Sequence, residues 1–341
     1  PLFFFQAEDG IGDPLWSRGL GDVYKRQVED LSIQELPDPV PNAGEVLIHV
    51  NAVGVNFPDA LLVRGLYQVK PALPFTPGIE CAGTVAALGE GVEGFSVGDR
   101  VAAMSPRFGT YSGAVTVPAS HAYAIPDGLD FDHAGAMLCA HGTAYHALVQ
   151  RAVLRPGETL LVTGAAGGTG LAAVQIGHAL GAHVIAACSS EDKMRIAKQH
   201  GADIAIHTGE NDVREAVKSL TGGAGADVIF DPVGGDLAQS LARSTAWNGR
   251  WLVIGFAEGA IPKIPLNLPL VKGYSIVGVF WGSFCHHDPA QAQANHRTLF
   301  DMAAGGSVKP HLHAVMPLKE ASDALSQIER REVRGKIVLK P

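Results

Sequence analysis

The stretch LVTGAAGGTGLAAVQIG, residues 161–177, decides how the rest of the chain is interpreted. Four glycines, Gly164, Gly167, Gly168 and Gly170, separate an apolar run from a run with helical spacing. Glycine is costly inside a helix or strand, so such a cluster indicates that the backbone closely approaches another group. Because the amides at a helix N-terminus bind anions, the stretch predicts an anion site between a strand and a helix.

The motif within this stretch is typical of dinucleotide binding. Residues 168–173, GTGLAA, fit the pattern GxGxxA directly after a predicted strand, which is the context that the pattern requires. One glycine allows the tight turn, one lets a pyrophosphate approach, and Ala173 lets the helix pack closely on the strand. A plain tight turn is the alternative. The predicted cofactor contacts in this loop are Ala166, Gly167, Gly168, Thr169 and Gly170.

The next predicted strand indicates which dinucleotide is bound. An NAD site normally has Asp or Glu near the end of this strand, where it binds the ribose hydroxyls. Here the strand ends in ACSS (residues 187–190) without a carboxylate, and Lys193 follows. Hydroxyls and a cation favour a 2′-phosphate, whereas a capping box of Ser189 and Asp192 is the alternative. We therefore predict NADPH, with Ser189, Ser190 and Lys193 among its contacts.

The pattern of strands and helices predicts two kinds of domain. From Glu158 onward, strands and helices alternate, which indicates a doubly wound parallel sheet. From Leu31 to Ile125, short apolar runs broken by glycine and proline indicate a compact β-barrel or sandwich. The final apolar run, GKIVLKP at residues 335–341, is expected to be a strand that rejoins the first domain. The predicted fold class is α/β.

Composition limits the possible partners. The chain has 341 residues, of which 47% are hydrophobic and 18% charged, so two domain cores are possible. A net charge of −8 disfavours a general nucleic-acid or anionic membrane surface. Four scattered cysteines without a CxxC are typical of a reducing compartment, and no apolar run is long enough to span a bilayer. We expect a cytoplasmic protein with a small-molecule partner.

The N-terminal residues differ in character from the rest. QAEDGI (residues 6–11) and SRGLGDVYKRQ (residues 17–27) resemble a translated sequencing adapter, in matching order and frame. A natural, variable N-terminal arm is the alternative. We expect residues 1–27 to be non-native and poorly packed, in place of a native start that includes a first strand.

The chain from about Val28 to Pro341 resembles the zinc-free quinone oxidoreductase branch of the medium-chain dehydrogenase/reductase superfamily. The resemblance lies in GVNFPDALLVRGLY (54–67), PGIECAGTV (77–85), GDRV (98–101), HGTAYHAL (141–148), GAAGGTGLAAVQ (164–175), VGVFWGSF (277–284) and GKIVL (335–339). It implies a GroES-like catalytic domain at residues 28–140 and 282–341. An NADPH-binding Rossmann domain would be inserted at residues 141–281, with the active site in the cleft between the domains.

The resemblance also implies a reaction without catalytic zinc. Zinc-dependent members have a cysteine at the position of Asn56, a histidine at that of Ile79, and a third ligand near Cys139. One thiol cannot hold a catalytic zinc, and Cys139 is interpreted as a buried small apolar residue. Without a Lewis acid, hydride transfer to an electron-poor acceptor is favoured, such as a quinone or an α,β-unsaturated carbonyl.

The same resemblance implies a catalytic set of three residues. Asn56 would lie near the nicotinamide and donate a hydrogen bond, with a turn asparagine as the alternative. Tyr67 would line the acceptor pocket and donate a proton, or else be a core residue. Thr143 would contact the carboxamide, or bond its own backbone. Glu80 is expected to tie the β-rich domain to the cleft. The further implied cofactor contacts are Asn56, Thr143, His207, Gly255, Phe256, Phe280, Trp281, Arg334 and Lys336.

Several of these contacts have simpler alternatives. Phe280 and Trp281 are also compatible with core packing, and Arg334 and Lys336 with solvated cations before a last strand. The apolar strand YSIVGVF, residues 274–280, would be an exposed sheet edge, and such edges are usually paired. We therefore expect a homodimer through this edge. The alternative functions are an acrylyl- or crotonyl-CoA reductase and a weakly catalytic NADPH-binding protein.

Overall fold

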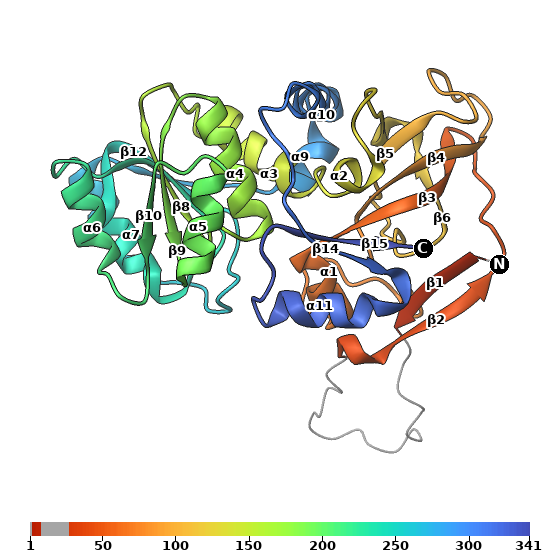
Figure 1. Ribbon diagram of the computed structural model, residues 1–341, viewed down its shortest axis with the longest axis horizontal. Coiled ribbons are helices and arrows are strands. Elements are labelled where there is room, and N and C mark those ends of the chain that lie inside the picture. Colours follow the sequence, from red (N-terminus) through yellow and green to blue (C-terminus); the bar gives the residue numbers. More distant parts are fainter. Residues whose placement is uncertain (1, 8–26) are drawn as a thin grey trace, which may run out of the picture. The chain divides into compact units, whose positions relative to one another are not determined.

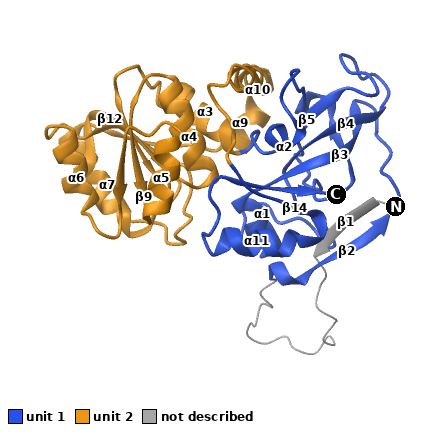
Figure 2. Cartoon of the chain, viewed as in Figure 1, with its two compact units in different colours: residues 1–139, 312–341 blue, residues 140–311 orange. Residues whose placement is uncertain are grey.

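The computed structural model describes residues 2–7, as backbone alone, and residues 27–341 (Figure 1). The chain forms two compact units (Figure 2). The first consists of residues 1–139 and 312–341, and the second of residues 140–311.

The second unit is built on a six-stranded sheet, in which every pair of neighbouring strands is parallel. Its strands are β8 (Thr159–Thr163), β9 (His183–Cys188), β10 (Ile204–His207), β11 (Ala226–Asp231), β12 (Thr245–Val253) and β13 (Ser275–Gly278). Their order is β10-β9-β8-β11-β12-β13, so the chain winds outward twice from the centre. This order confirms the predicted doubly wound sheet. The switch point, where such sheets bind ligands, lies between β8 and β11.

Helices cover both faces of this sheet. α4 (Gly168–Ala179) packs on one face, where a Cβ on Gly177 would lie 2.4 Å from the Leu160 side chain. α6 (Val213–Leu220) and α7 (Ala238–Ser244) cover the other face around a core that includes Leu161 and Trp251. The other helices of the unit are α3 (Ala140–Tyr145), a π-helix (His146–Arg151), α5 (Glu191–Gln199), a 3-10 turn (Gly235–Leu237), α8 (Asn267–Lys272), α9 (Trp281–His287) and α10 (Pro289–Ala304).

Residues 282–311 belong with this second unit, whereas the sequence prediction assigned them to the catalytic domain. The reason is a set of aromatic contacts with the start of the unit. A Cβ on Gly142 would lie 2.7 Å from the Trp281 indole, and the rings of His146 and Phe284 stack with centroids 3.9 Å apart. α10 packs against both α3 and α9. These contacts are tertiary and leave no periodic pattern in the sequence.

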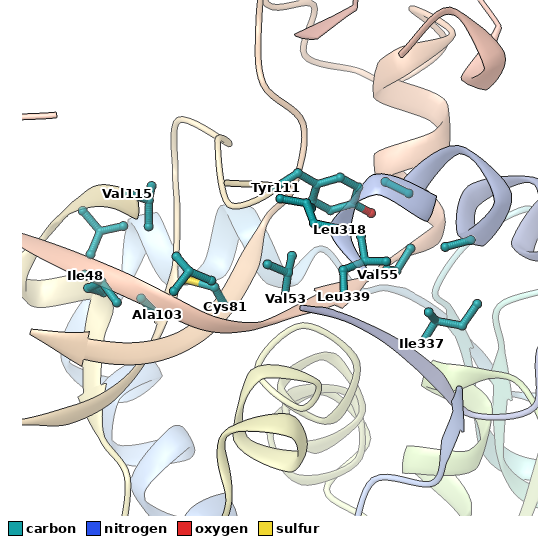
Figure 3. Close-up of a cluster of buried hydrophobic side chains, with 14 of the residues drawn as sticks. Ile48, Val53, Val55, Cys81, Ala103, Tyr111, Val115, Leu318, Ile337 and Leu339 are labelled. Carbon is teal, nitrogen blue, oxygen red and sulfur yellow. The ribbon is translucent and has the colours of Figure 1, made fainter. Parts of the chain in front are cut away.

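The first unit contains a mostly antiparallel seven-stranded sheet, in the order β14-β15-β3-β4-β5-β7 with β6 paired to β3. The strands are β3 (Glu45–Val55), β4 (Glu80–Leu88), β5 (Arg100–Met104), β6 (Ala114–Pro118), β7 (Ala122–Ala124), β14 (Leu312–Pro317) and β15 (Lys336–Lys340). β15 pairs with β3, so the end of the chain returns to this unit as predicted. Figure 3 shows part of its core, where Cys81, Val53 and Leu339 lie along the sheet.

In the described part of the first unit, the sheet is completed by three α-helices: α1 (Phe57–Val63), α2 (Phe131–Gly135) and α11 (Ala321–Glu329). Its 3-10 turns are Val28–Asp30, Ala119–His121 and Leu318–Glu320. Tyr111 and Leu318 are fully or almost fully buried in the same core (Figure 3). Among the residues that the structure describes, no helix of either unit is long and apolar enough to cross a membrane.

The N-terminal segment is paired in part. β1 (Leu2–Ala7) forms a separate two-stranded antiparallel sheet with β2 (Leu31–Leu36) (Figure 1). The backbone of residues 2–7 is thus paired, in contrast to the poor packing expected for residues 1–27. Residues 8–26, which carry most of the adapter-like sequence, lie outside the described residues.

Candidate active site

The glycine-rich stretch forms the turn between β8 and α4. Gly164 has a φ of +56°, which favours glycine, and the Gly167 amide donates to the Gly164 carbonyl at 2.9 Å. A Cβ on Gly170 would lie 2.3 Å from that same carbonyl oxygen, so the helix and the turn approach closely only with glycine there. Gly167 is the N-cap and has no side chain, which leaves the first amides of α4 for an anion. The turn therefore fits the cofactor contacts predicted for residues 166–170.

Four predicted contacts lie together where β9 and β10 end. His207 ends β10 directly beside Cys188 of β9, and Ser189 follows Cys188. The Lys193 ammonium donates to Ser189 Oγ at 3.1 Å, and the Lys193 backbone amide donates to Ser190 Oγ at 3.3 Å. Ser190 is thus the N-cap of α5, in place of the Ser189 cap considered from the sequence. A hydroxyl and an ammonium side by side are a donor pair that suits a phosphate.

Asp231 is a buried carboxylate at the switch point that is not among the predicted site residues. Its Oδ1 accepts hydrogen bonds from Thr163 Oγ1 at 2.6 Å and from the amides of residues 233–234 at 3.1 and 3.2 Å. Its Oδ2 accepts a bond from Trp251 Nε1 at 3.3 Å. Asp231 therefore joins the ends of β8 and β11 to the turn after β11. The sequence does contain a signal for this residue, since Asp231 directly follows the apolar run ADVIF. A carboxylate at the end of a buried strand needs hydrogen-bond partners.

The residues predicted on the nicotinamide side differ in exposure. Phe256 and Phe280 follow β12 and β13 at the carboxyl edge of the sheet and are 37% and 53% exposed, and Gly255 precedes Phe256. They lie at the edge where ligands of such sheets bind. Trp281 is only 3% exposed and packs against Gly142, next to Thr143. Its core-packing alternative is therefore the one that the structure favours.

A buried ionic network lies in the first unit. Lys336 Nζ donates to Glu80 Oε1 at 2.9 Å, to Asn56 Oδ1 at 2.5 Å and to the Val55 carbonyl at 2.7 Å. The Lys336 and Glu80 side chains are 4% and 0% exposed. All three ammonium hydrogens are engaged inside the unit, which contradicts the expectation that Lys336 reaches a cofactor phosphate. Arg334 is half-buried and donates to the carbonyl of Glu332.

Asn56 has both of its amide hydrogens engaged in this network. Asn56 Nδ2 donates to Glu80 Oε1 at 2.9 Å and to the Gly54 carbonyl at 3.1 Å. Its backbone amide donates to Asp59 Oδ2 at 2.8 Å, which places Asn56 as the N-cap of α1. Donation to a ligand requires one of these bonds to break. The structure therefore favours the alternative of an asparagine that organises a turn.

Asp59 and Tyr111 form a second buried polar pair beside Asn56. The Tyr111 hydroxyl donates to Asp59 Oδ2 at 3.1 Å, and Asp59 Oδ1 has no hydrogen-bond partner among the described residues. Burial raises the pKa of Asp59 to about 7, although its bond from the Asn56 amide and the charge of Lys336 lower it. Asp59 is thus a carboxyl group that holds its proton up to neutral pH.

Tyr67 and Cys139 are half-buried residues of the same unit. Burial raises the pKa of Tyr67 to about 12, with smaller contributions from Cys139 and Asp59. Its hydroxyl therefore keeps its proton at neutral pH. The Cys139 backbone amide donates to Glu80 Oε2 at 2.7 Å. The half-buried position of Cys139 differs from the buried position expected from the sequence.

A glycine turn at the switch point of a doubly wound sheet defines a dinucleotide-binding protein, in which a β-rich unit carries a buried polar network. Comparison with known proteins narrows this class. Residues 42–127 match the alcohol dehydrogenase GroES-like domain, and residues 168–296 match the domain described as zinc-binding dehydrogenase. The chain belongs to the quinone oxidoreductase-like branch of the medium-chain dehydrogenase/reductase superfamily, as the following similarities show.

Two curated relatives and one solved structure illustrate the similarity. The chain is 39% identical to quinone oxidoreductase-like protein 2 of Mus musculus over 338 residues, 96% of each chain. It is 34% identical to a quinone oxidoreductase of Pseudomonas aeruginosa over 314 residues, which cover 92% of this chain and 96% of the relative. The structure of Escherichia coli quinone oxidoreductase complexed with NADPH matches with a TM-score of 0.88 and 27% identity, over 99% of this chain and all of that one.

Proposed function

We propose that this oxidoreductase uses NADPH to reduce a quinone or an α,β-unsaturated carbonyl compound, without a catalytic zinc. The observation that carries the proposal is the pair formed by Ser189 and Lys193 directly after β9. The Lys193 ammonium lies 3.1 Å from Ser189 Oγ, and no carboxylate stands at the Ser189 position. This pair suits the 2′-phosphate that distinguishes NADPH from NADH. The close approach of Gly170 to the Gly164 carbonyl shapes the turn that would bind the pyrophosphate. The similarity to a relative complexed with NADPH supports the same cofactor.

The residue types at three positions support a zinc-free reaction. Asn56 and Ile79 stand where zinc-dependent members have ligands, and only Cys139 retains a thiol. Among the described residues, no group of three histidine, cysteine or acidic side chains is arranged to hold a metal ion. A tetrahedral catalytic zinc needs three protein ligands, so the residues present do not fit one.

The protein's part in the reaction would be to orient the two reactants and to donate hydrogen bonds. Bound NADPH supplies the hydride. Tyr67 keeps its proton because its pKa is about 12, so its hydroxyl can donate to an acceptor oxygen that gains negative charge. Thr143 and the exposed rings of Phe256 and Phe280 remain the proposed contacts on the nicotinamide side.

We expect NADPH oxidation by the purified protein with 1,4-benzoquinone or with a simple enone, at the same rate with and without a chelator. Crotonyl-CoA, measured in parallel, tests the alternative of an acyl-CoA reductase. Turnover that the chelator abolishes would contradict the zinc-free reaction. Tight NADPH binding without turnover of any acceptor would indicate the weakly catalytic binding protein instead.

The proposal includes a homodimer through the β13 edge. β13 pairs only with β12 within the sheet, and Ile276 on it is 41% exposed. Near it in the sequence, α8 exposes Leu270 and Val271 to 79% and 65%. An exposed apolar edge of this kind is usually covered by a partner strand.

We expect light scattering to give twice the chain mass of 35.7 kDa for the unaltered protein and the monomer mass for Ile276→Lys. Lysine on an edge strand disfavours strand pairing between chains. The matched control is Ile204→Lys, on the opposite edge strand β10, where Ile204 is 38% exposed. Dissociation caused equally by both substitutions, or by neither, would rule out β13 as the interface.

A further inference from the structure

Lys336 lies at the centre of the buried network in the first unit. Its ammonium donates to three acceptors: Glu80 Oε1, Asn56 Oδ1 and the Val55 carbonyl, at 2.5 to 2.9 Å. An ammonium group has three hydrogens, so its donor capacity is fully used. The contacts join β15, β3 and β4 at one point inside the unit.

Three segments meet in the network of Lys336 and Glu80, and the family resemblance places the zinc ligands of zinc-dependent members on these same segments. Asn56 occupies one ligand position and bonds Lys336 directly. Glu80 follows Ile79, the second position, and bonds both Lys336 and Asn56. The third position falls near Cys139, whose backbone amide donates to the other oxygen of Glu80 at 2.7 Å. Lys336 and Glu80 together thus link Asn56, the residue after Ile79 and the Cys139 backbone through hydrogen bonds, where a metal would link the three positions through ligand bonds.

The charges of the network require this cation. Glu80 is fully buried, and an unpaired buried carboxylate is strongly disfavoured. Asp59, also fully buried, is bonded to the Asn56 amide. With Lys336 charged, Glu80 is compensated and its two oxygens can hold Asn56 and the Cys139 backbone in one arrangement. Without the ammonium, Glu80 loses its counter-ion and Asn56 loses the donor to its Oδ1.

We propose that Lys336 is a positioning residue for hydride transfer, an internal ammonium that fixes the segments at Asn56, Glu80 and Cys139 as a catalytic metal does elsewhere in the superfamily. The proposal rests on the proposed reductase function. It assigns Lys336 no contact with either reactant. Lys336 acts through the backbone and side chains that it holds.

The test replaces Lys336 by methionine, which keeps the length of the side chain and removes the charge. The matched control is Lys340→Met, on the same strand, where the lysine is 42% exposed and bonded to Asp132. We expect Lys336→Met to keep its NADPH Kd within about twofold and to lose at least about tenfold in kcat with benzoquinone. Peptides that contain Asn56 or Cys139 should exchange amide hydrogen at least about tenfold faster. Lys340→Met should change none of these quantities.

A second variant separates positioning from charge balance. Lys336→Met with Glu80→Gln removes both buried charges, so it should fold more stably than the single variant. We expect its kcat to stay at least about tenfold below that of the unaltered protein. Full recovery of kcat in the double variant, or an unchanged kcat in the single one, would overturn the proposal. If the unaltered protein reduces no acceptor, the proposed function fails, and unchanged amide exchange in Lys336→Met would then overturn the positioning role separately.

Discussion

Replacing Ser189 by aspartate will weaken NADPH binding by about 100-fold and change NADH binding by less than about threefold. Ser189 lies at the end of β9, at the position where NAD-selective sheets carry a carboxylate. An aspartate there would repel a 2′-phosphate and would pair with the Lys193 ammonium, which bonds Ser189 Oγ at 3.1 Å. A like charge placed against a bound phosphate costs several kcal/mol. The measurement is a titration followed by the fluorescence of each reduced nucleotide.

The matched control for this substitution is Ser219→Asp, which adds the same charge on the exposed face of α6 in the same unit. It should leave both dissociation constants nearly unchanged, because Ser219 is exposed on a helix that supplies no predicted nucleotide contact, and exposed charges are screened by salt. An unaltered preference for NADPH in Ser189→Asp would show that the 2′-phosphate is bound elsewhere. Equal weakening of both nucleotides would indicate a damaged turn instead of a lost phosphate contact.

The parts of the fold that the sequence predicts correctly are those with local signals. β8, β9 and β11 are apolar runs that end at glycine, serine or aspartate, and each is followed by a helical pattern. The assignment of residues 282–311 fails for the opposite reason. That segment is held in the second unit by contacts such as Trp281 with Gly142 and Phe284 with His146, which join positions about 140 residues apart.

The same distinction applies to the candidate site. The glycine turn and the Ser189–Lys193 pair lie within a few residues of each other, so their spacing can be recognised in the sequence. The Lys336 bonds to Asn56 and Glu80 span 280 and 256 residues. Nothing in GKIVL indicates that its lysine points inward, because a lysine before a last strand is usually solvated. A buried cation of this kind can be recognised only from the sheet order, which places β15 beside β3.

Replacing Asp59 by asparagine will remove a pH-dependent loss of stability in the first unit. The pKa of Asp59 is about 7 in the folded chain and 3.8 without burial. Between these values the folded state keeps a proton that the unfolded state has released, so the contribution of Asp59 to stability falls as pH rises. The loss is complete above the folded pKa and amounts to roughly 4 kcal/mol. Asparagine does not titrate, so the free energy of unfolding of the variant should rise relative to that of the unaltered protein from pH 4 to 7.

The quantity to measure is the difference in free energy of urea unfolding between Asp59→Asn and the unaltered protein, from pH 4.5 to 8. Other groups titrate in the same range. Burial lowers the pKa of His296 to about 3, for example, which makes stability fall as pH drops below 6.5. These contributions are present in both proteins and cancel in the difference.

The matched control is Asp127→Asn, which removes a carboxylate from the exposed surface of the same unit and should give a nearly flat difference. The amide group introduced by Asp59→Asn has its own packing cost, which shifts the whole curve without changing its shape. A flat curve for Asp59→Asn would mean that Asp59 holds no proton at neutral pH. An Asp59 that Lys336 keeps ionised titrates below pH 4.5, so it would give the same flat curve in this range, and the ammonium would then be shared between two carboxylates.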